Sequence, residues 1–448
     1  MVSLETILSQ NPQLKNIRLE GTELPSEVIR FSDLTQRIVD GEDEFVGQCY
    51  YPFSVVPLIG KGAVLVDVEG NVFLDFLGGY GTQNLGHNEP HVEAAVDVLP
   101  GVVGLVARSY INPFLRQFCE TLVNHCGFAE DGYKAIPMST GAEAVETSLK
   151  GARIWGYEVK GVEANQAEII YCKNNFHGRT LGIISASTDE DVHTGFGPYL
   201  PGIKVIPFND PSALEKAITP HTVAFITEPI QGEAGVIIPD DGYLREVQET
   251  CNANNVLFLL DEIQSGGGRT GKPFAYMHEE GVKPDGIMVA KSISAGYYPI
   301  SAFVARADIV DLLKGRHGST FGGSARACLY GLEAIKQLEA QKIAEQSAEK
   351  GAYILNKLYD RFKDISTVKE VRGKGMWIAM EFTEPIAHEV AEELIDQGIL
   401  CKDAHDYTLR FVPPIVMTYQ QMDCALDRMG NVINNEKMTS IVEQKRAT

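Results

Sequence analysis

The sequence predicts an α/β protein with a large domain built on a mostly parallel central sheet and a smaller α+β domain. Short, almost continuous apolar runs alternate with helical segments through the middle of the chain, which is typical of parallel strands covered on both faces. The C-terminal region has the pattern of a strand, a helix and a second strand, which favours an α+β arrangement. With 448 residues, the chain is long enough for both domains.

The N-terminal region, residues 1–44, is polar and mixed, and we expect it to form an arm. Residues 45–100 follow as the first part of the small domain. Within them, two apolar runs at 63–68 and 72–77 flank a Glu-Gly-Asn turn, which predicts a hairpin.

The alternating pattern occupies residues 101–340, which we assign to the large domain. A helix is expected at 143–157, and a longer one at 324–341 leads into the C-terminal α+β part of the small domain, residues 341–448. The apolar runs that predict parallel strands lie at 168–172, 204–208, 223–227, 256–261 and 286–291.

Composition narrows the range of partners. The formal net charge of −21 argues against nucleic acid or an anionic membrane surface, because binding phosphates requires clustered Lys and Arg. No apolar run approaches about 18 residues, so we expect no membrane span. Eight scattered cysteines without a Cys-x-x-Cys pair, and an N-terminus without a targeting signature, indicate a cytoplasmic protein. We predict no metal site.

Two strand ends carry residues suited to catalysis. Asp261 and Lys291 each close an apolar run, at the edge of a parallel sheet where ligands bind. Taken alone, Lys291 is most simply the first exposed residue after a strand. A carboxylate that holds the pyridine nitrogen and a lysine that forms a Schiff base are, however, the two groups that pyridoxal phosphate requires.

A third feature is suited to phosphate. Ser139, Thr140, Gly141 and Ala142 stand directly before the predicted helix, where hydroxyls and backbone N–H groups at a positive helix end stabilise an anion. The same letters fit an ordinary capping box between Thr140 and Glu143. Spacing alone does not separate these two interpretations.

Several motifs together resemble the class III aminotransferases of fold type I, which are pyridoxal-phosphate enzymes. The resemblance runs from about residue 45 to 435 and includes most motifs of the family in order. Its motifs are GTQNLGH at 81–87, STGAEAVE at 139–146, NFHGRTLG at 175–182, TEPIQGEAGV at 227–236, LLDEIQSGGGRTG at 259–271, VAKSIS at 289–294 and HGSTFGGS at 317–324.

This resemblance implies that Asp261 pairs with the pyridine nitrogen and that Lys291 carries pyridoxal 5′-phosphate as a Schiff base. It also implies that Thr320 reaches the phosphate bound by a neighbouring subunit, which requires a homodimer with shared active sites. The other implied cofactor contacts are Ser139, Thr140, Gly141 and Ala142 at the phosphate, Phe176 stacked on the ring, Gln264 on the ring hydroxyl, and His177.

Within the class, the sequence is most similar to the ornithine δ-aminotransferases. By this resemblance, Arg179 binds the α-carboxylate of the substrate with two tyrosines, and Glu233 neutralises Arg410 until a 2-oxo acid arrives. Tyr80 could instead serve loop packing, and Arg410 could be a surface residue of a strand. The positions that match substrate contacts in those enzymes are Tyr50, Tyr80, Arg179, Glu233 and Arg410.

The resemblance therefore implies transfer of the δ-amino group of ornithine to 2-oxoglutarate, giving glutamate 5-semialdehyde and glutamate. His177 departs from it, because the ornithine enzymes carry tryptophan there and the acetylornithine enzymes histidine. The alternatives are a class III ω-aminotransferase for acetylornithine, lysine or a diamine, or an amino-acid racemase or epimerase on the same fold. A non-enzymatic cofactor-binding domain is disfavoured by the complete set of cofactor motifs.

Overall fold

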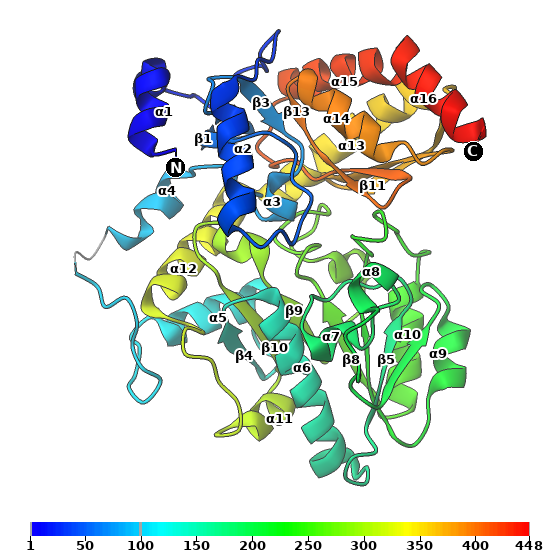
Figure 1. The fold of residues 1–448 in the computed structure, drawn as a ribbon. Coiled ribbons are helices and arrows are strands. Elements are labelled where there is room, and N and C mark those ends of the chain that lie inside the picture. Colours follow the sequence, from blue (N-terminus) through cyan, green and yellow to red (C-terminus); the bar gives the residue numbers. More distant parts are fainter. Residues whose placement is uncertain (1, 98–100, 448) are drawn as a thin grey trace. The chain divides into compact units, whose positions relative to one another are not determined.

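In a computed structural model, which describes residues 2–97 and 101–447, the chain divides into two compact units (Figure 1). The larger unit comprises Pro90–Glu349. The smaller unit joins the two ends of the chain, Met1–Glu89 and Lys350–Thr448. The boundaries predicted from the sequence instead lie after residues 100 and 340.

The larger unit is built on a seven-stranded mixed sheet. Strand β10 runs antiparallel to both of its neighbours, and the remaining pairs are parallel, so the predicted α/β class is confirmed. In sheet order the strands are β4 (Tyr133–Met138), β10 (Ser301–Arg306), β9 (Gly286–Val289), β8 (Leu257–Asp261), β7 (Thr222–Thr227), β5 (Glu168–Cys172) and β6 (Ile203–Ile206).

All five runs that predict parallel strands form strands of this sheet, with ends that differ by a few residues. The run predicted to end at Lys291 stops at Val289, and Lys291 begins a short helical turn, η5 (Lys291–Ser294). The prediction omits β4 and β10. Strand β4 contains Pro137, which weakens the sequence signal for a strand, and it lies at the edge of the sheet, where proline is tolerated.

Helices cover both faces of this sheet. Along β8, Leu257 and Leu259 pack in the cluster that includes α6 (Gly141–Trp155), whereas Phe258 and Leu260 pack in the cluster on the opposite face. This alternation is what a strand buried on both faces requires. The second cluster includes residues of α5 (Leu115–His125), α10 (Tyr243–Ala253) and α12 (Ala325–Ala340).

The smaller unit contains two four-stranded sheets. The predicted hairpin is present as β2 (Val64–Asp67) and β3 (Val72–Asp75), which pair antiparallel between β1 (Pro57–Lys61) and β13 (Ile399–Leu400). The second sheet contains β11 (Val368–Lys374), β12 (Trp377–Phe382), β15 (Thr408–Phe411) and β14 (Lys402–Ala404). The α-helices of this unit are α1 (Leu4–Gln10), α2 (Asp33–Phe45), the four-residue α3 (Gly78–Gly81), α14 (Ala387–Asp396), α15 (Tyr419–Ile433) and α16 (Glu436–Ala447). Helix α13 (Ile343–Phe362) spans the unit boundary.

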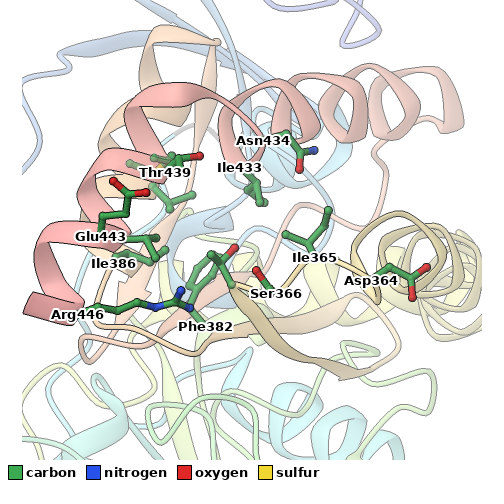
Figure 2. A pocket seen from close by; sticks show the side chains of 14 residues that line it. Asp364, Ile365, Ser366, Phe382, Ile386, Ile433, Asn434, Thr439, Glu443 and Arg446 are labelled. Atoms are coloured by element: carbon green, nitrogen blue, oxygen red, sulfur yellow. The ribbon is translucent and has the colours of Figure 1, made fainter.

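The C-terminal helix α16 is bound to the smaller unit by ion pairs, and a cavity of about 400 Å³ lies beneath it (Figure 2). Lys445 pairs with Glu389 at 2.9 Å, and Arg446 with Glu384 at 2.8 Å. None of the predicted site residues lines this cavity. Across residues 2–97 and 101–447, no helix has the length and apolar character needed to cross a membrane.

Candidate active site

Six strands of the larger unit end at one edge of the sheet, and a polar residue stands at the end of five of them or in the loop that follows. In sheet order these residues are Thr140 after β4, Lys291 after β9, Asp261 at the end of β8, Glu228 after β7 and His177 after β5. Ligands of open α/β sheets bind outside the carboxyl ends of the strands. The arrangement therefore brings together the predicted cofactor residues Lys291, Asp261 and Thr140.

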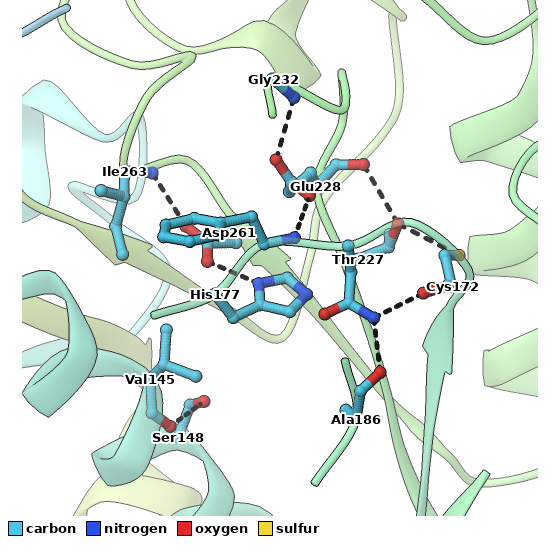
Figure 3. Close-up of polar contacts among 12 residues, drawn as sticks. Val145, Ser148, Cys172, His177, Ala186, Thr227, Glu228, Gly232, Asp261 and Ile263 are labelled. Carbon is cyan, nitrogen blue, oxygen red and sulfur yellow. Dashed lines mark hydrogen bonds and ion pairs between the residues drawn. The ribbon is translucent and has the colours of Figure 1, made fainter. Parts of the chain in front are cut away.

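Asp261 is oriented by two hydrogen bonds (Figure 3). One carboxylate oxygen lies 2.7 Å from Nδ1 of His177, and the other accepts the backbone N–H of Ile263 at 3.0 Å. Because an ionised carboxylate only accepts, Nδ1 of His177 carries the proton of this bond. Burial is the largest single effect and lowers the pKa of His177, but the hydrogen bond to Asp261 and the negative charges of Asp261 and Glu228 together outweigh it, so the pKa is raised.

Glu228 is a second buried carboxylate beside this pair, and the sequence analysis does not single it out. Its two oxygens accept the backbone N–H groups of Phe176 and Gly232, each at 3.1 Å (Figure 3). Burial raises the pKa of Glu228 to about 7, an effect that nearby His177 opposes and Asp261 reinforces. The available signal was its position directly after the buried strand β7, which resembles the position of Asp261.

Lys291 adopts a left-handed backbone conformation, with φ of 51°. This conformation costs an ordinary residue about 1–2 kcal/mol, and such strain is concentrated at functional positions. In the pairing of β8 with β9, Asp261 lies opposite Met288, three residues before Lys291. The lysine is half-buried, which contradicts the simple alternative of an exposed residue after a strand.

The N-terminus of α6 contains the capping box that the sequence allowed. The Thr140 hydroxyl accepts the N–H of Glu143 at 3.2 Å, and the Glu143 carboxylate accepts the N–H groups of Ser139 and Thr140, each at 2.9 Å. The box does not involve the N–H groups of Gly141 and Ala142, the first two helical residues. Capping and phosphate binding are therefore compatible at this helix end.

The segment that carries Thr320 lies against the same helix end of its own chain. The Ser319 hydroxyl donates to the Glu143 carboxylate at 3.3 Å, and the Ser301 hydroxyl donates to the carbonyl of Thr140 at 2.6 Å. Thr320 itself is exposed. Its predicted contact with the phosphate of a neighbouring subunit stays a prediction.

The remaining predicted residues of the larger unit lie on the loops that follow β5, β7 and β8. Phe176 is half-buried, Gln264 is buried and Arg179 is exposed. Glu233 lies in a tight loop that Gln231 and Ile237 close by exchanging two backbone hydrogen bonds of 3.0 and 2.9 Å. Among the residues that the structure describes, no cluster of His, Cys, Asp and Glu is suited to hold a metal ion.

In the smaller unit, Tyr80 lies in an unusual turn. Residues Gly78–Gly81 all have positive φ, with values of 54°, 57°, 56° and 81°, and we call this segment the Tyr80 turn. Glycine adopts this conformation readily, whereas Tyr80 does so at a cost of about 1–2 kcal/mol. A strained, non-glycine residue at a predicted substrate position favours a functional role over plain loop packing.

Arg410 lies in β15 and is only 3% exposed, so the alternative of a surface strand residue is wrong. Two residues further on, Val412 donates its N–H to the carbonyl of Phe76 at 2.7 Å, directly before the Tyr80 turn. The smaller unit thus brings the segments of Tyr80 and Arg410 together. Tyr50 is 62% exposed. Glu233 lies in the larger unit, and its ion pair with Arg410 stays a prediction.

Comparisons with known proteins identify the family. The model of the family "Aminotransferase class-III" matches residues 48–433. The ornithine aminotransferase of Halalkalibacterium halodurans is 43% identical over 400 residues, which cover 89% of this chain and 98% of that protein. A solved structure of the Toxoplasma gondii ornithine aminotransferase, which contains pyridoxal phosphate at its active site, is similar with a TM-score of 0.86 and 36% identity, covering 93% of this chain and 100% of the other.

The acetylornithine aminotransferase of Elizabethkingia anophelis is also similar, with a TM-score of 0.80 and 34% identity over 89% of this chain and 98% of the other. The chain therefore belongs to the class III aminotransferases. It is an aminotransferase, and pyridoxal 5′-phosphate, the cofactor predicted from the sequence, is the cofactor of this class. The carboxylate, the lysine and the open helix N-terminus at one sheet edge fit that cofactor.

Proposed function

We propose that the protein transfers the δ-amino group of ornithine to 2-oxoglutarate, giving glutamate 5-semialdehyde and glutamate, with pyridoxal 5′-phosphate as cofactor. The observation that carries the proposal is the placement of Asp261 and Lys291 at the ends of the adjacent strands β8 and β9. Identity of 43% to an ornithine aminotransferase along almost its whole length supports the choice of substrate.

The residues of the larger unit divide the cofactor-related work. Lys291 would hold the cofactor as a Schiff base and, as a free amine, would move a proton at the δ-carbon of the substrate. Asp261, held by His177, keeps the pyridine nitrogen protonated. Bound pyridoxal phosphate then supplies the electron sink that makes this proton removable. Gly141 and Ala142, with Ser139 and Thr140, hold the phosphate at the start of α6.

Further residues of the larger unit hold the ring. Phe176 would stack on the ring, and Gln264 would bond its hydroxyl. Glu228 supports this placement because it holds the backbone N–H of Phe176.

Substrate orientation follows from the charged residues. To react at the δ-amine, ornithine enters with its α-amino-acid head far from the cofactor, where Arg179 binds the carboxylate in a bidentate fork. The hydroxyls of Tyr50 and Tyr80 assist. Glu233 neutralises Arg410 during this half-reaction, and Arg410 becomes available when 2-oxoglutarate brings a second carboxylate.

We also propose that two copies of the chain form the working enzyme, with Thr320 of each reaching the phosphate held by the other. Exposed apolar side chains in the larger unit support this proposal, since Tyr110 is 75% and Ile111 is 93% exposed. Size measurement of the holoenzyme by light scattering tests it. A monomer with full activity would contradict it. The cytoplasmic location stays a prediction.

A second candidate is transfer from acetylornithine. It is favoured by His177, which is the residue that acetylornithine enzymes carry at this position, and by the similarity to such an enzyme. The two activities differ in whether the α-amino group of the donor is free. Arg179 can bind the α-carboxylate of either donor, so the two activities are distinguished by comparing the donors directly.

The experiment that tests the proposal is a half-reaction panel on the holoenzyme without any 2-oxo acid. Ornithine, acetylornithine, lysine, 4-aminobutyrate and an α-amino acid are added separately, and the visible absorbance band of the lysine-bound cofactor is followed. We expect ornithine to discharge the band at the highest kcat/KM. Lys291→Ala is expected to lack the band altogether. Retention of the band and of turnover in Lys291→Ala, or a preference for acetylornithine, would contradict the proposal.

A further inference from the structure

A buried carboxylate that the sequence analysis did not single out holds the entrance of the Tyr80 turn. Asp75 is the last residue of β3, and its side chain is 5% exposed. One of its oxygens accepts the backbone N–H groups of Leu77 and Gly78, each at 2.8 Å. These residues lead into the left-handed segment, so Asp75 determines the direction in which the chain enters it.

His87 holds the second oxygen of Asp75. Its Nε2 lies 2.7 Å from that oxygen, and Nε2 carries the proton because an ionised carboxylate only accepts. The backbone of His87 is fixed in turn, because it exchanges two hydrogen bonds of 2.8 and 2.9 Å with Gly62. A side chain at Gly60 would come within 3.0 Å of the Cβ of His87, so the ring lies tightly against β1.

The exit of the turn is also fixed. The backbone N–H groups of Thr82 and Gln83 both donate to the carbonyl of Gly78 at 2.9 Å. A Cβ at Gly78 would come within 2.4 Å of the carbonyl oxygen of Val412, so the turn packs directly against the segment that follows Arg410. Tyr80 is therefore the one large side chain on a backbone that is held at both ends.

We propose that Asp75 and His87 are positioning residues that select the substrate by keeping Tyr80 in its left-handed conformation, where its hydroxyl meets the α-amino-acid head of the amine donor. This inference rests on the proposed function, in which Tyr80 contacts that head. The influence of the pair passes through Tyr80. The pair therefore affects recognition of the donor's head and leaves the chemical step unchanged.

The first test compares two donors in the half-reaction. Ornithine carries an α-carboxylate, whereas 1,4-diaminobutane has the same chain and reacting amine without it. We expect His87→Ala to raise the half-saturating concentration of ornithine about tenfold, the equivalent of one lost charge-assisted hydrogen bond. The rate with 1,4-diaminobutane is expected to stay within about twofold of the wild-type rate. His87→Gln should restore ornithine binding, because the glutamine amide again donates to Asp75. An equal loss on both donors, or no rescue by glutamine, would overturn the inference.

The second test is a double-mutant cycle on ornithine with Asp75→Asn and Tyr80→Phe. If Asp75 acts through Tyr80, the double variant has the half-saturating concentration of Tyr80→Phe alone. If the two substitutions raise the half-saturating concentration independently, so that their factors multiply in the double variant, the inference is overturned. This holds even if Tyr80→Phe alone binds ornithine more weakly. No effect of Tyr80→Phe alone would instead count against the proposed function.

Asp423→Asn is the matched control. It makes the same exchange in the same unit, at a carboxylate that pairs with Lys357 at 2.9 Å and with the Tyr353 hydroxyl at 2.8 Å. This variant is expected to leave ornithine half-saturation unchanged. If it raises half-saturation as much as Asp75→Asn does, the effect is a general one of the unit and the inference is overturned.

Discussion

Among the described residues, each unit contains a histidine in close contact with a buried aspartate, and the surroundings of these two pairs differ. In both pairs the nitrogen and the carboxylate oxygen are 2.7 Å apart. In the smaller unit, the Asp75 oxygen that does not contact His87 accepts two backbone N–H groups, so the carboxylate shapes the Tyr80 turn. In the larger unit, the corresponding oxygen of Asp261 accepts only the N–H of Ile263 among the residues described, at the end of a strand where ligands bind.

The difference teaches that the surroundings of a His–Asp pair decide its role. His177 is completely buried, and its Nε2 has no hydrogen-bond partner among the described residues, whereas the His87 side chain is 19% exposed. A buried histidine whose single bond goes to a carboxylate at a strand end orients that carboxylate for a ligand. A partly exposed histidine that holds a carboxylate at the start of a turn orients the backbone of that turn. We therefore expect the first pair to govern the cofactor and the second to govern the substrate.

The largest expected effect comes from Asp261→Asn. An asparagine cannot keep a proton on the pyridine nitrogen, so the rate of the half-reaction should fall about a thousandfold with every amine donor. Asp75→Asn should leave the rate with 1,4-diaminobutane close to that of the wild type. Stopped-flow measurement of the visible band gives both rates. Similar losses in the two variants would remove the distinction between the pairs.

The next effect is on cofactor affinity. His177→Phe removes the donor that orients Asp261, and we expect the Kd for pyridoxal phosphate to rise about tenfold. His177→Asn should recover most of the affinity, because its amide can replace Nδ1 as the donor. Equilibrium titration of the apoprotein by absorbance measures these values. His87→Ala is the comparison, and a Kd for the cofactor that rises in that variant as well would contradict the division of roles.

These roles show what sequence could and could not predict. Lys291 and Asp261 follow apolar runs, so their place at the sheet edge followed from strand topology alone. The bond between His177 and Asp261 joins residues 84 positions apart and arises only when β5 and β8 lie in one sheet. The motifs predicted that His177 lies near the cofactor, but they did not predict its hydrogen-bond partner.

Glu228, Asp75 and His87 were missed for a related reason. Glu228 and Asp75 bind mainly backbone N–H groups, whose positions depend on φ and ψ values that the sequence does not show directly. His87 acts through its contact with Asp75. The glycines of the Tyr80 turn were visible in the sequence, but the run of four positive φ values was not. Strand β4 was missed because it contains a proline.

A last expected effect concerns the pH dependence of stability and not the reaction. Burial raises the pKa of Glu228 to about 7 from an ordinary value of 4.5, so between these values the folded protein binds more protons than the unfolded chain. Stability then falls as pH rises through this window, by at most about 1.4 kcal/mol per pH unit for this group. Glu228→Gln should flatten the slope between pH 5 and 7. Urea unfolding at several pH values measures it, and an unchanged slope would show that Glu228 is not the group responsible.

The central claim is that the enzyme presents the δ-carbon of ornithine to the cofactor on Lys291. The most direct measurement uses ornithine labelled with ¹⁵N at either the δ or the α position, with 2-oxoglutarate as acceptor and mass spectrometry of the glutamate formed. We predict that the δ label appears in glutamate and that the α label does not. Transfer of the α label, or no labelled glutamate from either substrate, would contradict the claim.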